Sequence, residues 1–218
     1  TDLGCIKAAF SGADTLPRCV KERFEEIVRQ QGGRTQLREG FGLTEAVTGI
    51  MAMPLTEYRE GSIGIPFPDM RAKIVKIGTQ EEAPVGEEGE ICIKLDPRPI
   101  GLFTQYLDEP EKTAAAMEGG VYHTGDKAWM DEDGYIWFLG RVDDLIKSSG
   151  YRIGPFEVES ALVSHPSVIE AAVTGVPDAV RGQLVKATVV LAPGYDPSEA
   201  LTNELQDHVK SVTAPYKY

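Results

Sequence analysis

The sequence predicts a mixed α/β (α+β) protein, and three observations support this class. Short apolar runs bounded by glycines and charged residues predict strands along the first two-thirds of the chain. Residues 129–138 have the pattern of a hairpin, with residues 131–134 (DEDG) as its turn. After Gly154, helical and strand patterns follow one another. The 218 residues allow one or two domains, and the 42% of hydrophobic residues are enough to form a core.

The first part of the chain is predicted to hold mostly strands. An amphipathic helix over residues 17–32 places Val20, Phe24, Ile27 and Val28 on one face, and the Gly-Gly pair at 32–33 ends it. Further strands are predicted over residues 3–10, 71–77 and 90–95, and a short helix over residues 110–117. Residues 135–139 form an apolar run that predicts a buried strand.

The second part is predicted to be a βαβ-like α+β unit. Residues 148–155 are rich in turn formers and predict a loop, after which Pro155 suits the first position of a helix that continues to Val163. Residues 168–176 and 184–191 predict strands, joined by a loop over residues 177–182. Ser198 is expected to cap a helix from Glu199 to about Val212.

Composition and charge exclude several classes of function. The net charge of −12 argues against a nucleic-acid partner, which requires a basic face. The sequence has neither an apolar run long enough for a transmembrane helix nor a signal peptide. The three cysteines lack a CxxC spacing and are expected to be buried free thiols in a reducing compartment. His123, His165 and His208 lack metal-ligand spacing and are interpreted as packing residues.

Two short stretches contain residues suited to a nucleotide. In residues 40–45 (GFGLTE), glycines allow close approach of the backbone, and Glu45 offers the hard oxygen that suits Mg²⁺. On these residues alone, a turn before a helix capped by Thr44 is the favoured alternative. Asp126 can accept two hydrogen bonds from a ribose diol and Gly125 leaves room for the sugar, with a surface turn as the alternative.

Residues 140–159 (GRVDDLIKSSGYRIGPFEVE) resemble the linker motif of the adenylate-forming superfamily, which includes acyl-CoA synthetases, luciferases and peptide-synthetase adenylation domains. Four further stretches agree with the family in order: FGLTE at 41–45, GEICI at 89–93, YHTGD at 122–126 and APYKY at 214–218. Residues 97–103 and 149–159 are most similar to the medium-chain acyl-CoA synthetase branch. The resemblance covers essentially the whole sequence.

This resemblance implies two domains. Residues 1–142 would be the C-terminal part of the large AMP-binding domain, ending in a small β-barrel-like subdomain. Residues 143–218 would be a truncated small mobile domain. Because Thr1 is not an initiator Met, we expect the sequence to begin within a longer protein or after processing. The family's phosphate loop and terminal catalytic lysine are expected to lie outside it.

The resemblance also implies the residues of two sites. Phe41 would stack on adenine, Thr44 would contact the α-phosphate, Glu45 would hold Mg²⁺, and Asp126 with Arg141 would bind the ribose. The full ATP/AMP set is Gly12, Ala13, Glu39, Gly40, Phe41, Gly42, Leu43, Thr44, Asp126 and Arg141, with Thr44 and Glu45 catalytic. The CoA set is Ser149, Gly150, Tyr151, Arg152, Arg181, Lys210 and Tyr218, with Asp143 as the hinge. Residues 61–67 would form part of the acyl-pocket wall, or equally a loop between strands.

The implied function is an ATP-dependent acyl-CoA synthetase that acts on a medium-chain fatty acid through an acyl-adenylate. Its substrates would be a small carboxylic acid, ATP and CoA, with Mg²⁺ as the metal. The alternatives are an adenylation domain that loads a carrier protein and, for these residues alone, a nucleotide-binding piece without turnover. The expected location is the cytoplasm, or the mitochondrial matrix in a eukaryote. The acyl chain length and the oligomeric state are not predicted.

Overall fold

A computed structural model describes residues 2–13 and 16–213, so Tyr218 and the APYKY stretch lie outside the described residues. The chain divides into two compact units. One comprises Thr1–Leu16 and Arg23–Val142, and the other comprises Pro17–Glu22 and Asp143–Tyr218. No described helix is long and apolar enough to cross a membrane.

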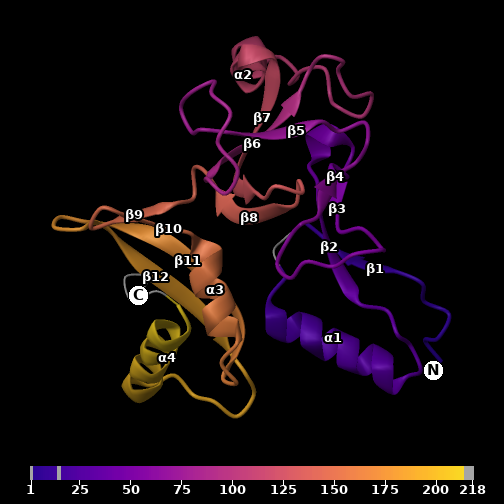
Figure 1. The fold of residues 1–218 in the computed structure, drawn as a ribbon. Helices are drawn as coiled ribbons and strands as arrows, with labels where there is room; N and C mark the ends of the chain where they lie inside the picture. Colours follow the sequence, from indigo (N-terminus) through magenta and orange to yellow (C-terminus); the bar gives the residue numbers. More distant parts are fainter. Residues whose placement is uncertain (1, 14–15, 214–218) are drawn as a thin grey trace. The chain divides into compact units, whose positions relative to one another are not determined.

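The first unit begins with a small sheet in the order β1-β2-β3-β4 (Figure 1). Its strands are β1 (Ala9–Ser11), β2 (Leu37–Phe41), β3 (Met51–Ala52) and β4 (Ile65–Pro66). Only β1 and β2 are parallel, and they are joined through helix α1 (Arg18–Gln30), the kind of crossover that a parallel pair requires. Because β1 begins only at Ala9, the prediction of a strand over residues 3–10 was wrong except at its end.

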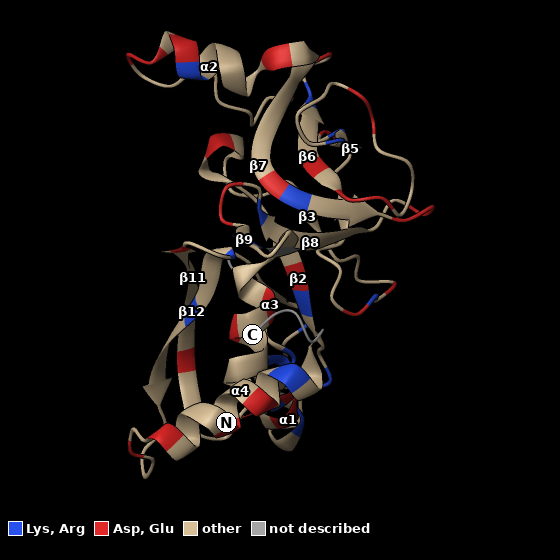
Figure 2. Ribbon diagram, turned by 90° about the vertical axis from the view of Figure 1, so that its left-hand side faces the viewer, with Lys and Arg blue, Asp and Glu red and all other residues tan. Residues whose placement is uncertain are grey.

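Helix α1 ends as predicted, because Gly32 adopts the left-handed conformation with φ of 82°. On the predicted apolar face, Val28 is the buried residue of the helix, while Val20 and Ile27 are exposed. Charges of both signs run along α1 (Figure 2), and Arg18 pairs with Glu22 at 2.7 Å. The described residues thus leave part of the apolar face of α1 uncovered.

A second sheet completes the first unit, in the order β5-β6-β7-β8 with every pair antiparallel. Its strands are β5 (Ala72–Val75), β6 (Gly89–Lys94), β7 (Val121–Met130) and β8 (Ile136–Arg141). Helix α2 (Pro110–Ala116) and two 3-10 turns, η1 (Thr44–Ala46) and η2 (Glu118–Gly120), lie between strands. The hairpin over residues 129–138 is confirmed. The outer strands β5 and β8 are not paired with each other among the described residues, so this sheet is open and not a closed barrel.

The first unit has one main hydrophobic core, to which both of its sheets contribute. Isoleucines from the strands and the connecting loops are almost completely buried, and they pack with methionines in one cluster: Ile50, Met51, Ile74, Ile91, Ile93 and Ile136. Cys92 is buried as expected, whereas Cys5 is exposed, which contradicts the prediction of a buried thiol there.

The second unit is a four-stranded sheet with two helices. Its strands are β9 (Ile146–Ser148), β10 (Tyr151–Ile153), β11 (Val168–Asp178) and β12 (Gly182–Leu191), and its helices are α3 (Pro155–Val163) and α4 (Glu199–Val212). The sheet order is β10-β9-β12-β11. Every pair is antiparallel, so the prediction of a βαβ-like unit was wrong. The loop predicted over residues 148–155 is instead largely the β9–β10 hairpin.

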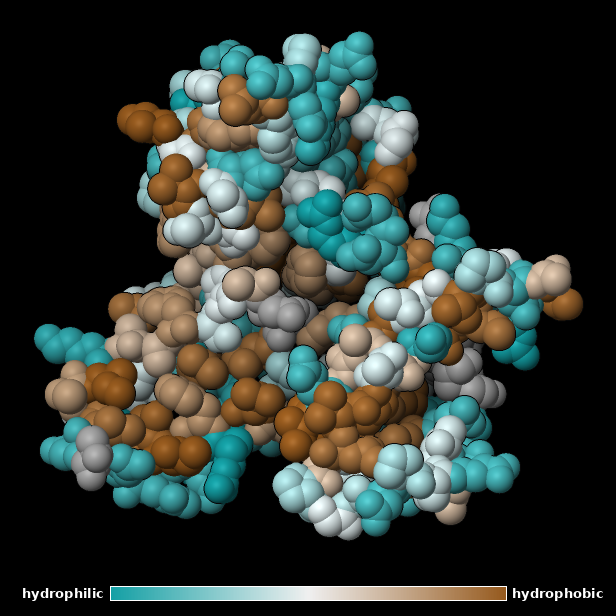
Figure 3. Space-filling model, turned by 180° about the vertical axis from the view of Figure 1, so that it is seen from behind, coloured by the Kyte–Doolittle hydropathy of each residue, from teal (hydrophilic) through white to brown (hydrophobic). Residues whose placement is uncertain are grey.

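Both helices of the second unit begin where the sequence predicts. Pro155 occupies the first turn of α3, and the Ser198 hydroxyl accepts the backbone N–H of Leu201 at the start of α4. Their apolar faces cover the sheet with residues such as Val158 and Leu205. Hydrophobic side chains also form patches on the molecular surface (Figure 3), and Val190 on β12 is one of the exposed ones.

Candidate nucleotide site

The residues predicted to bind ATP gather around two neighbouring cavities in the first unit. One has a volume of about 360 Å³ and is lined by Ala13, Glu39, Gly40, Phe41, Gly42, Leu43, Ile63, Asp126, Phe138 and Arg141. The other, of about 690 Å³, shares Ala13 and the stretch from Gly40 to Leu43, and adds Gly12 and Thr44. The whole predicted ATP/AMP set therefore lines one or both cavities.

The wall from Gly40 to Leu43 contains two glycines, which present only main-chain atoms. β2 ends at Phe41, and the chain then turns so tightly that a Cβ on Gly42 would lie 1.2 Å from the carbonyl oxygen of Thr48. The Thr48 N–H donates to the Leu43 carbonyl at 3.0 Å and closes the turn. Thr44 is exposed and begins η1, while Leu43 is its N-cap residue, so the alternative of a helix capped by Thr44 was wrong.

Asp126 and Arg141 lie opposite each other on β7 and β8 as direct cross-strand partners. The Arg141 Nη1 is 3.5 Å from the Asp126 Oδ1 and donates to the Thr124 carbonyl at 2.9 Å. Asp126 is buried in the middle of a strand, which excludes the alternative of a surface turn. The pair presents a carboxylate acceptor and a guanidinium donor to the smaller cavity.

Gly125 allows Arg141 to reach this position. Its φ of 74° lies in the left-handed region, and a Cβ there would be 2.7 Å from the Arg141 Nη2. The Gly125 N–H donates to the Glu90 Oε1 at 2.8 Å, and the Val142 N–H donates to the Gly125 carbonyl, also at 2.8 Å. Glycine is therefore required here for both backbone conformation and space.

Glu45 lines neither cavity, and its carboxylate is held by a residue that the sequence did not reveal. The hydroxyl of Tyr106 donates to the Glu45 Oε1 at 3.1 Å. Burial is the main cause of the raised pKa of Tyr106; a hydrogen bond from Tyr122 opposes the rise and the bond to Glu45 adds to it. The phenol thus stays protonated and can donate to the carboxylate. Because Tyr106 lies 61 residues from Glu45, no local pattern could have linked them.

Two apolar residues missing from the predicted set also line the smaller cavity. Phe138 lies 6.0 Å from Phe41 between ring centroids, with the planes tilted by 35°. Ile63 is fixed by its N–H, which donates to the Ile136 carbonyl at 2.9 Å. Phe138 falls within a stretch that was predicted only as a strand, and Ile63 falls within a stretch that was interpreted as a possible acyl-pocket wall.

The residues predicted for CoA lie on the second unit. Ser149 and Gly150 form the turn of the β9–β10 hairpin, with φ of 50° and 85°, and Tyr151 and Arg152 follow on β10. The Ser149 N–H donates to the carbonyl of Arg181 at 2.9 Å, which brings the β11–β12 turn to this hairpin. Lys210 comes from a separate element, α4, where its Nζ is 2.9 Å from Asp207.

The turn that carries Arg181 is held by a carboxylate. The Asp178 Oδ1 accepts the N–H groups of Arg181 at 2.7 Å and of Val180 at 2.9 Å. These hydrogen bonds lower the pKa of Asp178 because they favour its charged form. Asp143, the predicted hinge, is exposed and is the first residue after the division between the units.

Two family models match separate parts of this chain. The family described as "AMP-binding enzyme" matches residues 1–107, and the family described as "AMP-binding enzyme C-terminal domain" matches residues 157–218. Acyl-coenzyme A synthetase ACSM5, mitochondrial, of Rattus norvegicus is 48% identical over 98% of this chain and 36% of its own length. Acyl-coenzyme A synthetase ACSM3, mitochondrial, of Homo sapiens is 52% identical over the same shares.

Solved structures show the same likeness. o-Succinylbenzoate CoA synthetase from Bacillus subtilis, in complex with its acyl-adenylate intermediate, has a TM-score of 0.82 and 31% identity over 98% of this chain and 41% of that one. The same enzyme in complex with ATP and magnesium ion has a TM-score of 0.78 and 30% identity over 96% and 41%. The present chain thus spans little more than a third of the length of the relatives, 36% of each. Its motifs, its folds and these matches show that it belongs to the adenylate-forming family of AMP-binding enzymes.

Proposed function

We propose that this sequence belongs to an ATP-dependent acyl-CoA synthetase that acts on a medium-chain fatty acid. The carboxylate would attack the α-phosphate of ATP and give an acyl-adenylate and pyrophosphate, and the CoA thiol would then displace AMP. The observation that carries this proposal is the buried Asp126 beside Arg141 at a cavity that two glycines and two phenylalanines also line. The identity of 48% and 52% to two named acyl-CoA synthetases supports the acyl and thiol partners.

The nucleotide would be held mainly through its ribose. A carboxylate can accept hydrogen bonds from both hydroxyls of a diol, and Arg141 lies beside Asp126 as its ion-pair partner. Phe41 and Phe138 give the cavity an aromatic side against which an adenine ring could stack. Gly40 and Gly42 let the main chain approach the ligand closely.

The phosphates would lie beyond Thr44, whose exposed hydroxyl lines the larger cavity. Glu45 fits a magnesium ligand, because it offers a half-buried hard oxygen oriented by Tyr106. When bound, Mg²⁺ would offset the negative charge of the phosphates. The chain's own contribution to the adenylation step is positioning and charge stabilisation.

The second unit would serve the thioester step. In this proposal, residues 1–142 are the end of the large AMP-binding domain, residues 143–218 belong to the small mobile domain, and Asp143 is the hinge between them. The exposed turn at Ser149 and Gly150, with Arg181 beside it, would accept the pantetheine and phosphate groups of CoA. Lys210 would add a second cation.

The proposal is tested by incubating the full-length protein that contains this sequence with ATP, CoA and saturated carboxylates from butyrate to decanoate, while both AMP and acyl-CoA are measured. Formation of both products is expected. AMP without acyl-CoA would instead favour an enzyme that loads a carrier protein, and the absence of both would refute the proposal. Asp126→Ala and Arg141→Ala should each weaken nucleotide use about ten- to hundredfold, because a charge-assisted contact contributes about 1.5–3 kcal/mol.

The names of the relatives state that they are mitochondrial. We therefore favour the mitochondrial matrix over the cytoplasm as the location of a protein with this sequence. Fractionation of cells that express it in full would test this, and recovery outside mitochondria would contradict it.

A further inference from the structure

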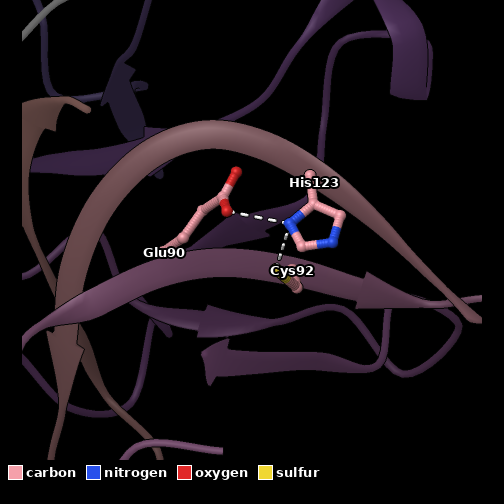
Figure 4. A group of neighbouring side chains, drawn as sticks. All are labelled: Glu90, Cys92 and His123. Carbon is pink, nitrogen blue, oxygen red and sulfur yellow. Dashed lines mark hydrogen bonds and ion pairs between the residues drawn. The ribbon is translucent and has the colours of Figure 1, made fainter. Parts of the chain in front are cut away.

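Three side chains of metal-binding type converge on one face of the β6–β7 pair (Figure 4). Glu90 and Cys92 are two residues apart on β6 and therefore share a face of the strand, and His123 on β7 is the cross-strand partner of Cys92. The His123 Nδ1 is 2.8 Å from the Glu90 Oε2 and 3.5 Å from the Cys92 Sγ. One atom from each of the three residues lies within 4.8 Å of the others.

Neither tautomer of His123 satisfies this group. If Nδ1 carries the proton, it donates to Glu90, but the Cys92 thiol then has no acceptor on the ring. If Nδ1 is unprotonated, it can accept from the thiol, but its lone pair then faces the Glu90 carboxylate. In both forms the buried Nε2 has no hydrogen-bond partner among the described residues. A cation at the point of convergence would use all three facing atoms at once.

The spacing suits a tetrahedral metal. Zn²⁺ binds cysteine sulfur at about 2.3 Å and histidine nitrogen at about 2.0–2.1 Å, so a tetrahedral angle separates the two donors by about 3.6 Å. The observed distance from Sγ to Nδ1 is 3.5 Å. The distance from Nδ1 to Oε2, 2.8 Å, is shorter, and a small rotation of the Glu90 carboxylate would lengthen it.

We propose that Glu90, Cys92 and His123 form a Zn²⁺ site in which a water molecule completes the coordination. A thiolate, an imidazole and a carboxylate form a donor set that favours Zn²⁺ over Mg²⁺, which prefers oxygen alone. On binding, the Cys92 thiol loses its proton to solvent and its sulfur bonds to the metal. The imidazole stays neutral, with its proton on Nε2.

The metal has a route to this site. Cys92 is completely buried, but the side chains of Glu90 and His123 retain 15% and 18% of their exposure and open the cluster to solvent. Coordination through the Glu90 Oε2 leaves its Oε1 on the Gly125 N–H. The metal therefore adds a link between β6 and β7 and leaves the turn before Asp126 in place, so it should stabilise the folded chain.

The test uses Co²⁺ as a spectroscopic probe for the zinc site in the full chain. Titration of the apoprotein with Co²⁺ should give absorption of a tetrahedral cobalt–thiolate centre and release one proton per metal bound, and Zn²⁺ should then abolish the band by displacing Co²⁺ without further proton release. Cys92→Ala should remove the thiolate band and weaken binding at least about tenfold, since even loss of a residue that only orients a ligand costs about that much. Glu90→Gln should weaken binding while keeping an oxygen for the Gly125 N–H.

Two controls make the result decisive. Cys5→Ala removes the exposed thiol and Cys19→Ala a partly buried one, and neither should change the band. Circular dichroism must show that each variant is folded. If folded wild-type protein gives no thiolate band, or if the band persists in Cys92→Ala or disappears in Cys5→Ala, the site does not exist as proposed.

Discussion

Replacement of Gly125 by alanine should damage the nucleotide site through two separable effects. The first is backbone strain, because φ is 74° and an L-residue in the left-handed region costs about 1–2 kcal/mol. The second is steric, because the new Cβ would lie 2.7 Å from the Arg141 Nη2 and 3.1 Å from its Cζ. Arg141 must then move away from the Thr124 carbonyl and from Asp126.

The free-energy cost of the steric effect can be bounded from the exposure of the Arg141 side chain. A hydrogen bond from a charged group contributes about 1.5–3 kcal/mol, but the Arg141 side chain is 41% exposed, so solvent reduces this to about 1 kcal/mol. Gly125→Ala should therefore lower the free energy of unfolding by about 2–3 kcal/mol in total. Because Arg141, which we propose lies at the ribose, is displaced, AMP affinity should fall about tenfold, which corresponds to about 1.4 kcal/mol.

Gly120 provides the matched control. It has the same φ of 74°, but a Cβ there meets nothing within 4 Å. Gly120→Ala should therefore cost only the strain of about 1–2 kcal/mol and leave AMP affinity unchanged. Urea unfolding and calorimetric titration with AMP measure both quantities. If the two variants lose equal stability and bind AMP equally well, Gly125 does not serve to make room for Arg141.

Three further predictions concern the second unit. Asp143→Pro fixes φ near −65° and should slow one half-reaction by orders of magnitude. The other half-reaction and the melting temperature should change little. Equal loss of both half-reactions would exclude a hinge at Asp143. Arg181→Ala and Lys210→Ala should raise the KM for CoA and spare carboxylate-dependent pyrophosphate exchange, whereas loss of exchange would assign them to adenylation or folding. Because the pKa of Asp178 is lowered, its charged form stabilises the fold at pH values above 3.8, the usual pKa of the group. This contribution is lost as the pH falls from there through the lowered pKa. The difference in unfolding free energy between wild type and Asp178→Asn should therefore disappear in acid, and a difference independent of pH would contradict this.

Local chemistry explains which elements could be predicted from the sequence. Helices α3 and α4 begin as expected because Pro155 and Ser198 specify a helix start within a few residues. The hairpin of β7 and β8 was predicted from its acidic turn and its apolar strands. The resemblance to a known family supplied the residues proposed to bind the nucleotide, and the structure places them around two cavities.

The features that were missed depend on distant partners. The order of the second sheet depends on the pairing of β9 with β12, two strands far apart in sequence, which periodicity does not encode. The bond from Tyr106 to Glu45 and the meeting of Cys92 with His123 have the same origin. For α1, the helical pattern identified the apolar stripe correctly, but no pattern within the helix could show that Val20 and Ile27 would remain exposed.

The two glycines in the cavity wall, Gly40 and Gly42, have a consequence for how such a protein can evolve. At both positions the chain offers the cavity only backbone groups, whose chemistry does not depend on side chains. Gly42 is also fixed by space, since any Cβ there would collide with the Thr48 carbonyl. Selectivity for the acyl group could therefore diverge elsewhere in the protein while the nucleotide requirement stays constant, which would let one scaffold serve many carboxylic acids.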